Sequence, residues 1–397
     1  MSLQIKKWGI SFLHGLLLFI IAWVWLSFYT TYDKEIFFIK WASGIKRVFL
    51  NLDDDPPAKE YLFIDLAHDK ELIASEKVLG NDVVTDRKKL AALFNICKRN
   101  PNSYKFILCD VYLKGDSPND SLLAASVKDL RKTVFPIHSA TGDSLEIPKF
   151  KVPYALADYT TEGGLFFKYT LQSQSQFSTL PVYMYEQLNG GNIQWHPFFV
   201  TDKGRLIFNN FIVDFPIRNF EVFNNHAYPV ITLSELLLLP EDIIVNQFLK
   251  DRIILAGDFE NDIHTTIYGN TTGTLILLNT YLTLKMGYHI VSPLWIMMML
   301  GLFTLISYQV FYRNNFFSTR QKDKRYSFIA SYLNYIIVLA AIAIGSYLIF
   351  HVYISILVLA LYLNCISFLV GLNNKTRQLP NLHEMFTHIK NTYFNFR

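Results

Sequence analysis

Hydrophobic positions along the chain gather in four blocks, which cover residues 9–29, 294–312, 328–350 and 352–372. Each block is close to the ~20 residues that a helix needs to cross a hydrocarbon layer of ~30 Å. The first block ends in aromatic residues rather than in the small residues of a signal-peptide cleavage site, so we expect a retained anchor. The last two blocks meet at His351, which predicts a tight hairpin. The pattern indicates a multi-pass membrane protein with four spans.

Basic residues flank these blocks and predict the orientation of the spans. They are Lys6, Lys7, Arg313, Arg320, Lys322, Lys324, Arg325, Lys375 and Arg377. Because cytoplasmic loops carry an excess of Lys and Arg, both termini and the connector 313–327 are expected in the cytoplasm. The chain then divides into a first span within residues 1–29, an extracytoplasmic domain over 30–292, three spans over 293–372, and a short cytoplasmic tail, 373–397.

Within the outer segment, short apolar runs alternate with amphipathic stretches. Strands are predicted at Tyr61–Asp65, Lys105–Asp110 and Thr133–Pro136, and helices between them are predicted to begin after Asp86 and at Ser117. Alternation of strand and helix at this spacing favours parallel pairing through right-handed crossovers.

The middle of the outer segment has a more β-rich pattern. Antiparallel strands are predicted at 165–169 and within 195–215, with a helix at 181–188 between them. A further core strand is predicted at Arg252–Gly257, and a helix over Gly273–Met286 leads back to the membrane. The expected fold class is an α/β extracytoplasmic domain, with a mixed sheet and βαβ units, beside an α-helical membrane region of four spans.

An apolar stripe at helical spacing follows the first span. It consists of Phe37, Trp41, Ile45, Val48 and Phe49. The stripe predicts a helix that continues from the membrane and packs on the domain, with a helix on the lipid surface as the alternative.

Composition and charge exclude several classes of function. Hydrophobic residues make up 51% of the 397 residues and charged residues 18%, which is typical of a membrane protein. A net charge of +4 over this length is too weak to indicate a nucleic-acid partner. Three cysteines without paired spacing predict neither a disulfide framework nor structural zinc.

Acidic residues follow three of the predicted core strands. Because the carboxyl ends of parallel strands meet at one edge, we expect these side chains to form a ligand-binding site there. The candidate residues are Asp65, Asp110, Asp258, Asp262 and His264. Carboxylates suit Ca²⁺ or Mg²⁺, and His264 would suit a transition metal. The alternative is that each Asp caps a turn or helix, so the metal is left unknown and no cofactor is expected.

Catalytic motifs are missing from the sequence. It contains no Gly-x-Ser-x-Gly, no His-Glu-x-x-His and no Walker loop, and the pair His138-Ser139 is interpreted as a chance neighbourhood. We therefore expect that the protein is not an enzyme.

Several stretches of the outer segment resemble the second type of CHASE domain, the cyclase- and histidine-kinase-associated extracellular sensory module of bacteria. Phe63-Ile64-Asp65 is similar to the first strand of that family. Phe106–Asp110, followed by Asp116–Leu123, is similar to its strand ending in Asp and its acidic helix start. Arg252–Gly257 resembles its most recognisable stretch, together with Asp262, Thr265, Gly269, Gly273 and Asn279. The resemblance covers nearly the whole chain, since the family shares the order of one span, outer domain and three clustered spans.

The chain also departs from the family. Leu277 stands where a His is usual, Gly163-Gly164 where Asp-Gly is common, and the usual prolines near Thr266 and Thr272 are missing. Members commonly continue into a cyclase or kinase, and here only residues 373–397 follow the last span. The resemblance therefore implies a sensor in a bacterial inner membrane that signals to a separate protein.

Three classes of function remain, each with its own partners. The first is a sensory module that binds an outside ligand or partner and signals through its spans to an unidentified membrane or cytoplasmic protein. The second is a structural or assembly subunit of an envelope complex with a sensor-like fold. The third is an outer enzyme. The expected partners are the lipid bilayer, that unidentified protein and a second copy as a homodimer, without nucleic acid.

Overall fold

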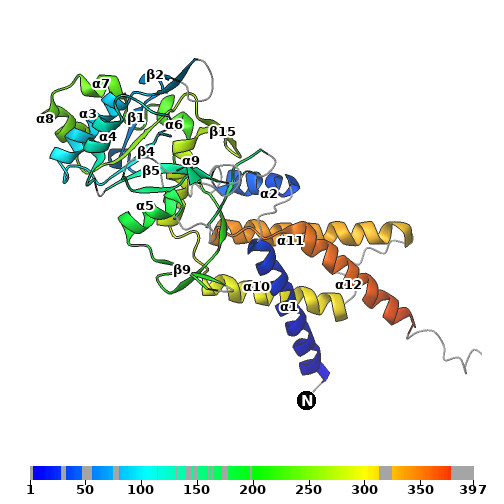
Figure 1. The fold of residues 1–397 in the computed structure, drawn as a ribbon. Coiled ribbons are helices and arrows are strands. Elements are labelled where there is room, and N and C mark those ends of the chain that lie inside the picture. The colour runs from blue at the N-terminus through cyan, green and yellow to red at the C-terminus, as the bar shows by residue number, and fades with distance from the viewer. Residues whose placement is uncertain are drawn as a thin grey trace, which may run out of the picture. The chain divides into compact units, whose positions relative to one another are not determined.

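The fold is seen in a computed structural model (Figure 1). It describes residues 3–27, 33–46, 56–74, 80–113, 115–130, 132–139, 145–146, 151–159, 161, 164–171, 178–196, 199–312 and 324–376. The chain forms two compact units. We name them after the predicted topology: the membrane unit combines Met1–Phe28 with Ser292–Arg397, and the outer unit contains Tyr29–Val291.

The membrane unit is helical. Its helices are α1 (Leu3–Ser27), α10 (Pro293–Tyr312), α11 (Lys324–Phe350) and α12 (Ile356–Thr376). Among the described residues, three stretches are long and apolar enough to span a membrane: Leu3–Leu26, Pro293–Tyr312 and Leu333–Phe350. The apolar part of α12, Ile356–Val370, is shorter. Three candidate spans are thus present, and the fourth stays a prediction.

Polar contacts join the helices of the membrane unit. Nδ1 of His14 lies 2.7 Å from the hydroxyl of Ser307, and its Nε2 lies 3.2 Å from the hydroxyl of Tyr362. Trp295 donates from Nε1 to the hydroxyl of Ser346 at 2.8 Å. Contacts of this kind place polar side chains between helices rather than against lipid tails, as we expect for a helical bundle.

A parallel sheet forms the centre of the outer unit. Its strands, in spatial order, are β13 (Val230–Thr232), β1 (Tyr61–Asp65), β14 (Ile253–Gly257), β4 (Phe106–Asp110), β5 (Thr133–Ser139) and, both paired to β5, β6 (Leu145–Glu146) and β7 (Tyr154–Leu156). All of these pairs are parallel except that of β5 with β6. The predicted parallel pairing is confirmed. The structure adds that β14, from late in the chain, lies between β1 and β4.

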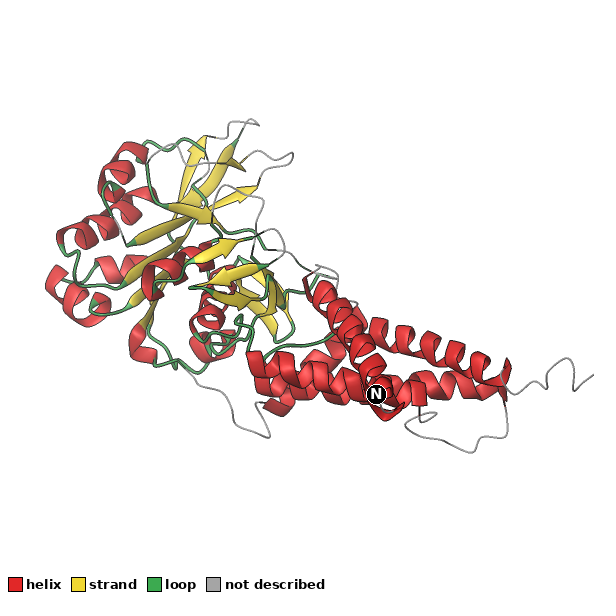
Figure 2. Ribbon diagram, turned by 90° about the horizontal axis from the view of Figure 1, so that it is seen from below, coloured by secondary structure: helices red, strands yellow, loops and turns green. Residues whose placement is uncertain are grey.

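Helices cover both faces of the sheet (Figure 2). One face packs on α3 (Arg87–Arg99), α4 (Asp120–Val127), α7 (Leu233–Leu237) and the π-helix η3 (Ile244–Leu249), which directly follows the short helix α8 (Glu241–Ile243), and the other on α5 (Leu180–Asn189), α6 (Asn219–Phe223) and α9 (Gly273–Lys285). In β1, Tyr61 and Phe63 belong to one apolar cluster, and Leu62 and Ile64 to the other. Successive strand residues face opposite ways, so a continuous apolar run supplies both cores.

Helix starts agree with the predicted caps at one site and differ at another. Asp86 caps α3, since its carboxylate accepts a hydrogen bond from the backbone N–H of Lys89 at 3.0 Å. The helix predicted from Ser117 begins only at Asp120, so this start was wrong. Ser117 accepts from the N–H of Asn119, and its own N–H donates to Asp120. These bonds close a turn ahead of the helix.

The remaining strands form two- and three-stranded antiparallel sheets. They are β2 (Lys70–Ala74) with β3 (Asn81–Thr85), β8 (Lys168–Thr170) with β12 (Asn210–Ile212), β15 (Ile263–Thr266) with β16 (Gly269–Thr272), and β9 (Ile193–Trp195), β10 (Val200–Asp202) and β11 (Arg205–Ile207) together. The antiparallel prediction for the middle of the domain is confirmed. The hairpin β2–β3 was not predicted.

Helix α2 (Asp33–Gly44) follows the first span, as predicted, but with a different buried face. Phe37 and Trp41, which were expected to pack, are each 59% exposed. Ile36 and Ile39 are buried instead. Val48 and Phe49 of the predicted stripe lie outside the described residues. The packing interpretation of this stripe is therefore wrong for its first two members.

Candidate functional site

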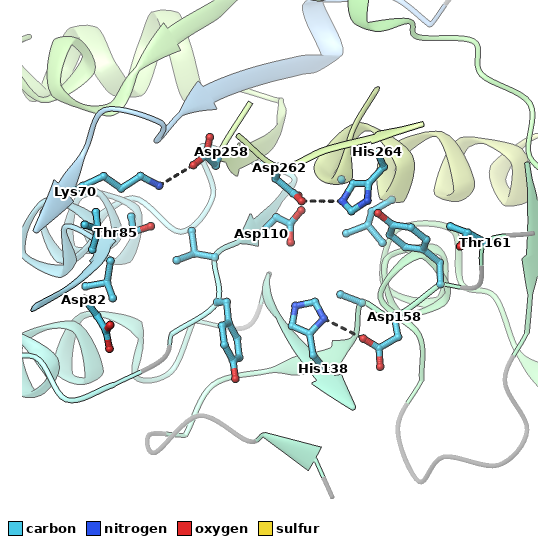
Figure 3. Close-up of a pocket in the computed structure, with 18 residues that line it drawn as sticks. Lys70, Asp82, Thr85, Asp110, His138, Asp158, Thr161, Asp258, Asp262 and His264 are labelled. Atoms are coloured by element: carbon cyan, nitrogen blue, oxygen red, sulfur yellow. Dashed lines mark hydrogen bonds and ion pairs between the residues drawn. The ribbon is translucent and has the colours of Figure 1, made fainter. Parts of the chain in front are cut away.

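A cavity of about 820 Å³ opens at the carboxyl edge of the parallel sheet. Its walls come from the ends of β4 and β5, the segments after β7 and β14, the hairpin β2–β3 and the start of α9 (Figure 3). Its polar lining includes Lys70, Asp82, Thr85, Asp110, His138, Asp158, Tyr159, Asp258, Asp262 and His264. Open α/β sheets gather ligands at this edge, because several loops and helix starts converge there.

Asp110, the last residue of β4, is central to this cavity. Thr274, in the first turn of α9, donates a hydrogen bond from its hydroxyl to Oδ2 of Asp110 at 2.8 Å. Figure 3 shows the carboxylate of Asp262 directed toward that of Asp110. Burial and then the charge of Asp262 raise the pKa of Asp110 to about 6. Asp110 is therefore a carboxyl group that changes protonation close to neutral pH.

Asp262 pairs with His264, which also lines the cavity. Nε2 of His264 lies 2.7 Å from Oδ1 of Asp262, and this hydrogen bond raises the pKa of His264. The Tyr159 ring contacts the His264 ring edge-on, with centroids 5.3 Å apart. A Cβ at Gly273 would collide with the Asp262 carboxylate in its present position, so the glycine leaves room for this group beside the start of α9.

Tyr159 places a buried hydroxyl at the cavity. That hydroxyl has no hydrogen-bond partner among the described residues. Burial, together with the charges of Asp262 and Asp110, raises the pKa of Tyr159 above its ordinary value. The phenol therefore stays protonated and remains a donor for a bound molecule.

His138 and Asp158 are among the site residues that the sequence did not predict. Nδ1 of His138, near the end of β5, lies 3.0 Å from Oδ1 of Asp158, which follows β7. The ring of Tyr112 contacts His138 edge-on at 5.4 Å. The signal that predicted Asp110, a polar residue at the end of an apolar strand, is also present at His138. The sequence prediction for His138 concerns only its neighbour Ser139, as a chance pair.

Two of the predicted site residues form local caps. Asp65 accepts hydrogen bonds at Oδ1 from the N–H groups of Ala67 and Phe259, at 3.0 and 3.3 Å, and does not line the cavity. Asp258 lines it but accepts from the N–H of Asn261 at 2.9 Å and pairs with Lys70 at 2.8 Å. Burial opposes ionisation of Asp258, but these bonds outweigh it and hold its pKa below the ordinary value. Both residues thus make the hydrogen bonds of a cap, and Asp258 lines the cavity as well.

The remaining predicted residues, Asp110, Asp262 and His264, do meet in the cavity. Within the described ranges, no three His, Cys, Asp or Glu side chains have the arrangement of a metal site. The geometry instead offers hydrogen-bond donors and acceptors on several walls of a cavity large enough for a small molecule.

Comparisons with protein-family models, with curated proteins and with solved structures find no match.

Proposed function

We propose that this protein is a sensory module of a bacterial inner membrane. Its outer domain binds a small polar molecule in the cavity, and its spans pass the change to a separate protein. The observation that carries the proposal is the cavity of about 820 Å³ at the carboxyl edge, with Asp110 and Asp262 directed into one space. The resemblance to the second type of CHASE domain supports the same function.

The charges on the cavity wall favour a ligand with a positive group. Five aspartates line it, against one lysine and two histidines. Lys70, His138 and His264 each pair with one aspartate, so the bases are already engaged by Asp258, Asp158 and Asp262. Asp82 and Asp110 are the two other aspartates of the lining, and Asp110, at the end of the central strand β4, is the one placed beside Asp262 to receive a further cation. An organic ammonium group fits this site, because it can donate to carboxylates and pack against the rings of Tyr112 and Tyr159.

Helix α9 provides a route from the cavity toward the membrane. Gly273 lines the cavity and Thr274 bonds to Asp110, while the other end of α9 is Lys285. The following residues add backbone hydrogen bonds: Phe208 donates to His289 at 2.8 Å, and Val291 donates to Leu206 at 2.9 Å. The candidate span α10 begins two residues later, at Pro293. A shift of α9 on ligand binding would thus be passed along a short, hydrogen-bonded connection.

The proposal is tested by thermal unfolding of the full chain in nanodiscs with a panel of amino acids, di- and polyamines and quaternary amines. We expect at least one of these compounds to raise the melting temperature saturably, since ligand at a hundredfold excess over Kd adds about 2.7 kcal/mol to stability. Asp110→Asn and Asp262→Asn should abolish the shift. Asp242→Asn, which changes an exposed carboxylate outside the cavity, should keep it.

Two results would contradict the proposal. If no compound gives a saturable shift, or if the compound that does so acts equally on Asp110→Asn, the cavity is not a sensory site. Crosslinkers placed in the connector 313–327 then test whether the protein is a structural subunit. Recovery of self-crosslinked protein alone would favour a structural subunit of an envelope complex.

A further inference from the structure

Helix α2 has one buried face, and two polar contacts hold the helix to the outer unit. Ile36, Ile39 and Ala42 on this face are buried. The hydroxyl of Ser43 lies 2.6 Å from that of Tyr268. Just beyond α2, Lys46 forms a buried ion pair with Asp214. These two contacts are polar and specific, so they fix the orientation of α2 relative to the domain.

The opposite face of α2 is exposed and aromatic. Phe37 and Trp41 are each 59% exposed, and their rings lie one helical turn apart with centroids separated by 6.0 Å. Lys40, between them, is also exposed. We call Phe37, Lys40 and Trp41 the aromatic face. Two large exposed rings beside a lysine are typical of helices that lie in a membrane interface.

The chain keeps this face close to the membrane. The candidate span α1 ends at Ser27 and α2 begins at Asp33, so residues 28–32 alone connect them. A chain of this length, even fully extended, reaches roughly 20 Å. The start of α2 therefore lies within about 20 Å of the end of the span. This short connection keeps the first turn of α2 near the end of the span.

We propose that the aromatic face binds the headgroup layer of the membrane that α1 crosses. The rings of Phe37 and Trp41 enter the interface, and the ammonium group of Lys40 reaches lipid phosphates. Because Ser43 and Lys46 hold α2 to the domain, this contact sets the orientation of the outer domain on the membrane. The proposal is independent of the cavity and its ligand.

The test uses nitroxide labels in full-length protein in nanodiscs of phosphatidylethanolamine and phosphatidylglycerol. Labels are attached at Phe37→Cys and, separately, at Trp41→Cys, so that each variant keeps one ring. Cys365 is replaced by serine, and the buried Cys97 and Cys109 are kept. The matched control is Leu238→Cys, because Leu238 is an apolar residue that is 84% exposed.

Collision rates with oxygen and with a water-soluble nickel chelate report the depth of each label. We expect oxygen to dominate at positions 37 and 41 and the chelate to dominate at 238. Equal chelate access at all three positions, in variants whose melting temperatures match the parent, would overturn the proposal. Spin–spin broadening at 37 or 41 that disappears on dilution with unlabelled protein would also overturn it, since a second copy would then cover the face.

Discussion

The hydroxyl of Thr274 lies 2.8 Å from Oδ2 of Asp110 and joins the first turn of α9 to the end of the central strand β4. Two glycines leave room for the side chains around this contact. A Cβ at Gly257 would collide with Thr274, and one at Gly273 would collide with Asp262. One hydrogen bond thus joins Asp110 to the helix that precedes the candidate span α10 in the chain.

Asp110→Asn should change how stability depends on pH. The pKa of Asp110 is about 6 in the folded protein, above the ordinary 3.8, so the folded state holds the extra proton between these values. Its contribution to stability is therefore lost as pH rises from about 4 to 6, by about 3 kcal/mol at most. Asp110→Asn should raise the melting temperature at pH 8 while changing it little at pH 4. Asp242→Asn is the control, and an equal gain there would contradict the assignment to Asp110.

His289 should produce a pH dependence of opposite sign. It is fully buried 3.5 Å from Asp202, and burial lowers its pKa to about 4. The unfolded state therefore binds the proton first, and stability is lost as pH falls from about 6.5 to 4, by about 3 kcal/mol. His289→Gln should reduce the fall in melting temperature between pH 6.5 and pH 4, measured in a series of melting curves. If the melting temperature of the variant falls as steeply as that of the parent, His289 is not the cause of this loss of stability.

The buried pair of Lys46 and Asp214 should show strong coupling. Lys46→Met alone leaves a buried carboxylate without its cation, and we expect a loss of about 3–5 kcal/mol. Lys46→Met combined with Asp214→Asn removes both charges and should recover part of that loss. Melting curves of the parent, both single variants and the double variant give a double-mutant cycle, which measures the interaction between the two side chains. Strictly additive losses would mean that the two side chains do not interact.

The predicted topology places the outer unit outside the cytoplasm. In a background with serine at Cys365, Leu238→Cys should react with an impermeant thiol reagent in intact cells, because Leu238 is 84% exposed. Ser318→Cys, within the basic connector, should react only after the membrane is opened. Labelling of Ser318→Cys in intact cells, with Leu238→Cys protected, would reverse the orientation.

Local patterns in the sequence were enough for the elements and for part of the site. The apolar runs predicted β1, β4 and β14, and Asp86 predicted the start of α3, because strand burial and helix capping depend on neighbouring residues. The same pattern selected Asp110, since a residue that ends a core strand must lie at the sheet edge. Three candidate spans follow equally directly from length and hydropathy.

Only the tertiary structure decided which strand-end acids share the cavity. Asp65 and Asp110 both end a core strand and both stand beside Gly257 in the register of the sheet. Asp65 meets the N–H of Phe259 and becomes a cap, whereas Asp110 meets Thr274 and Asp262 at the cavity. The difference arises because β14 is inserted between their strands. Gly257 of β14 pairs with Asp110 and with Asp65, which lie about 150 and about 190 positions earlier in the chain. Such long-range pairing, like the exposure of Phe37 and Trp41, depends on which surfaces the folded chain brings together, and no local pattern encodes it.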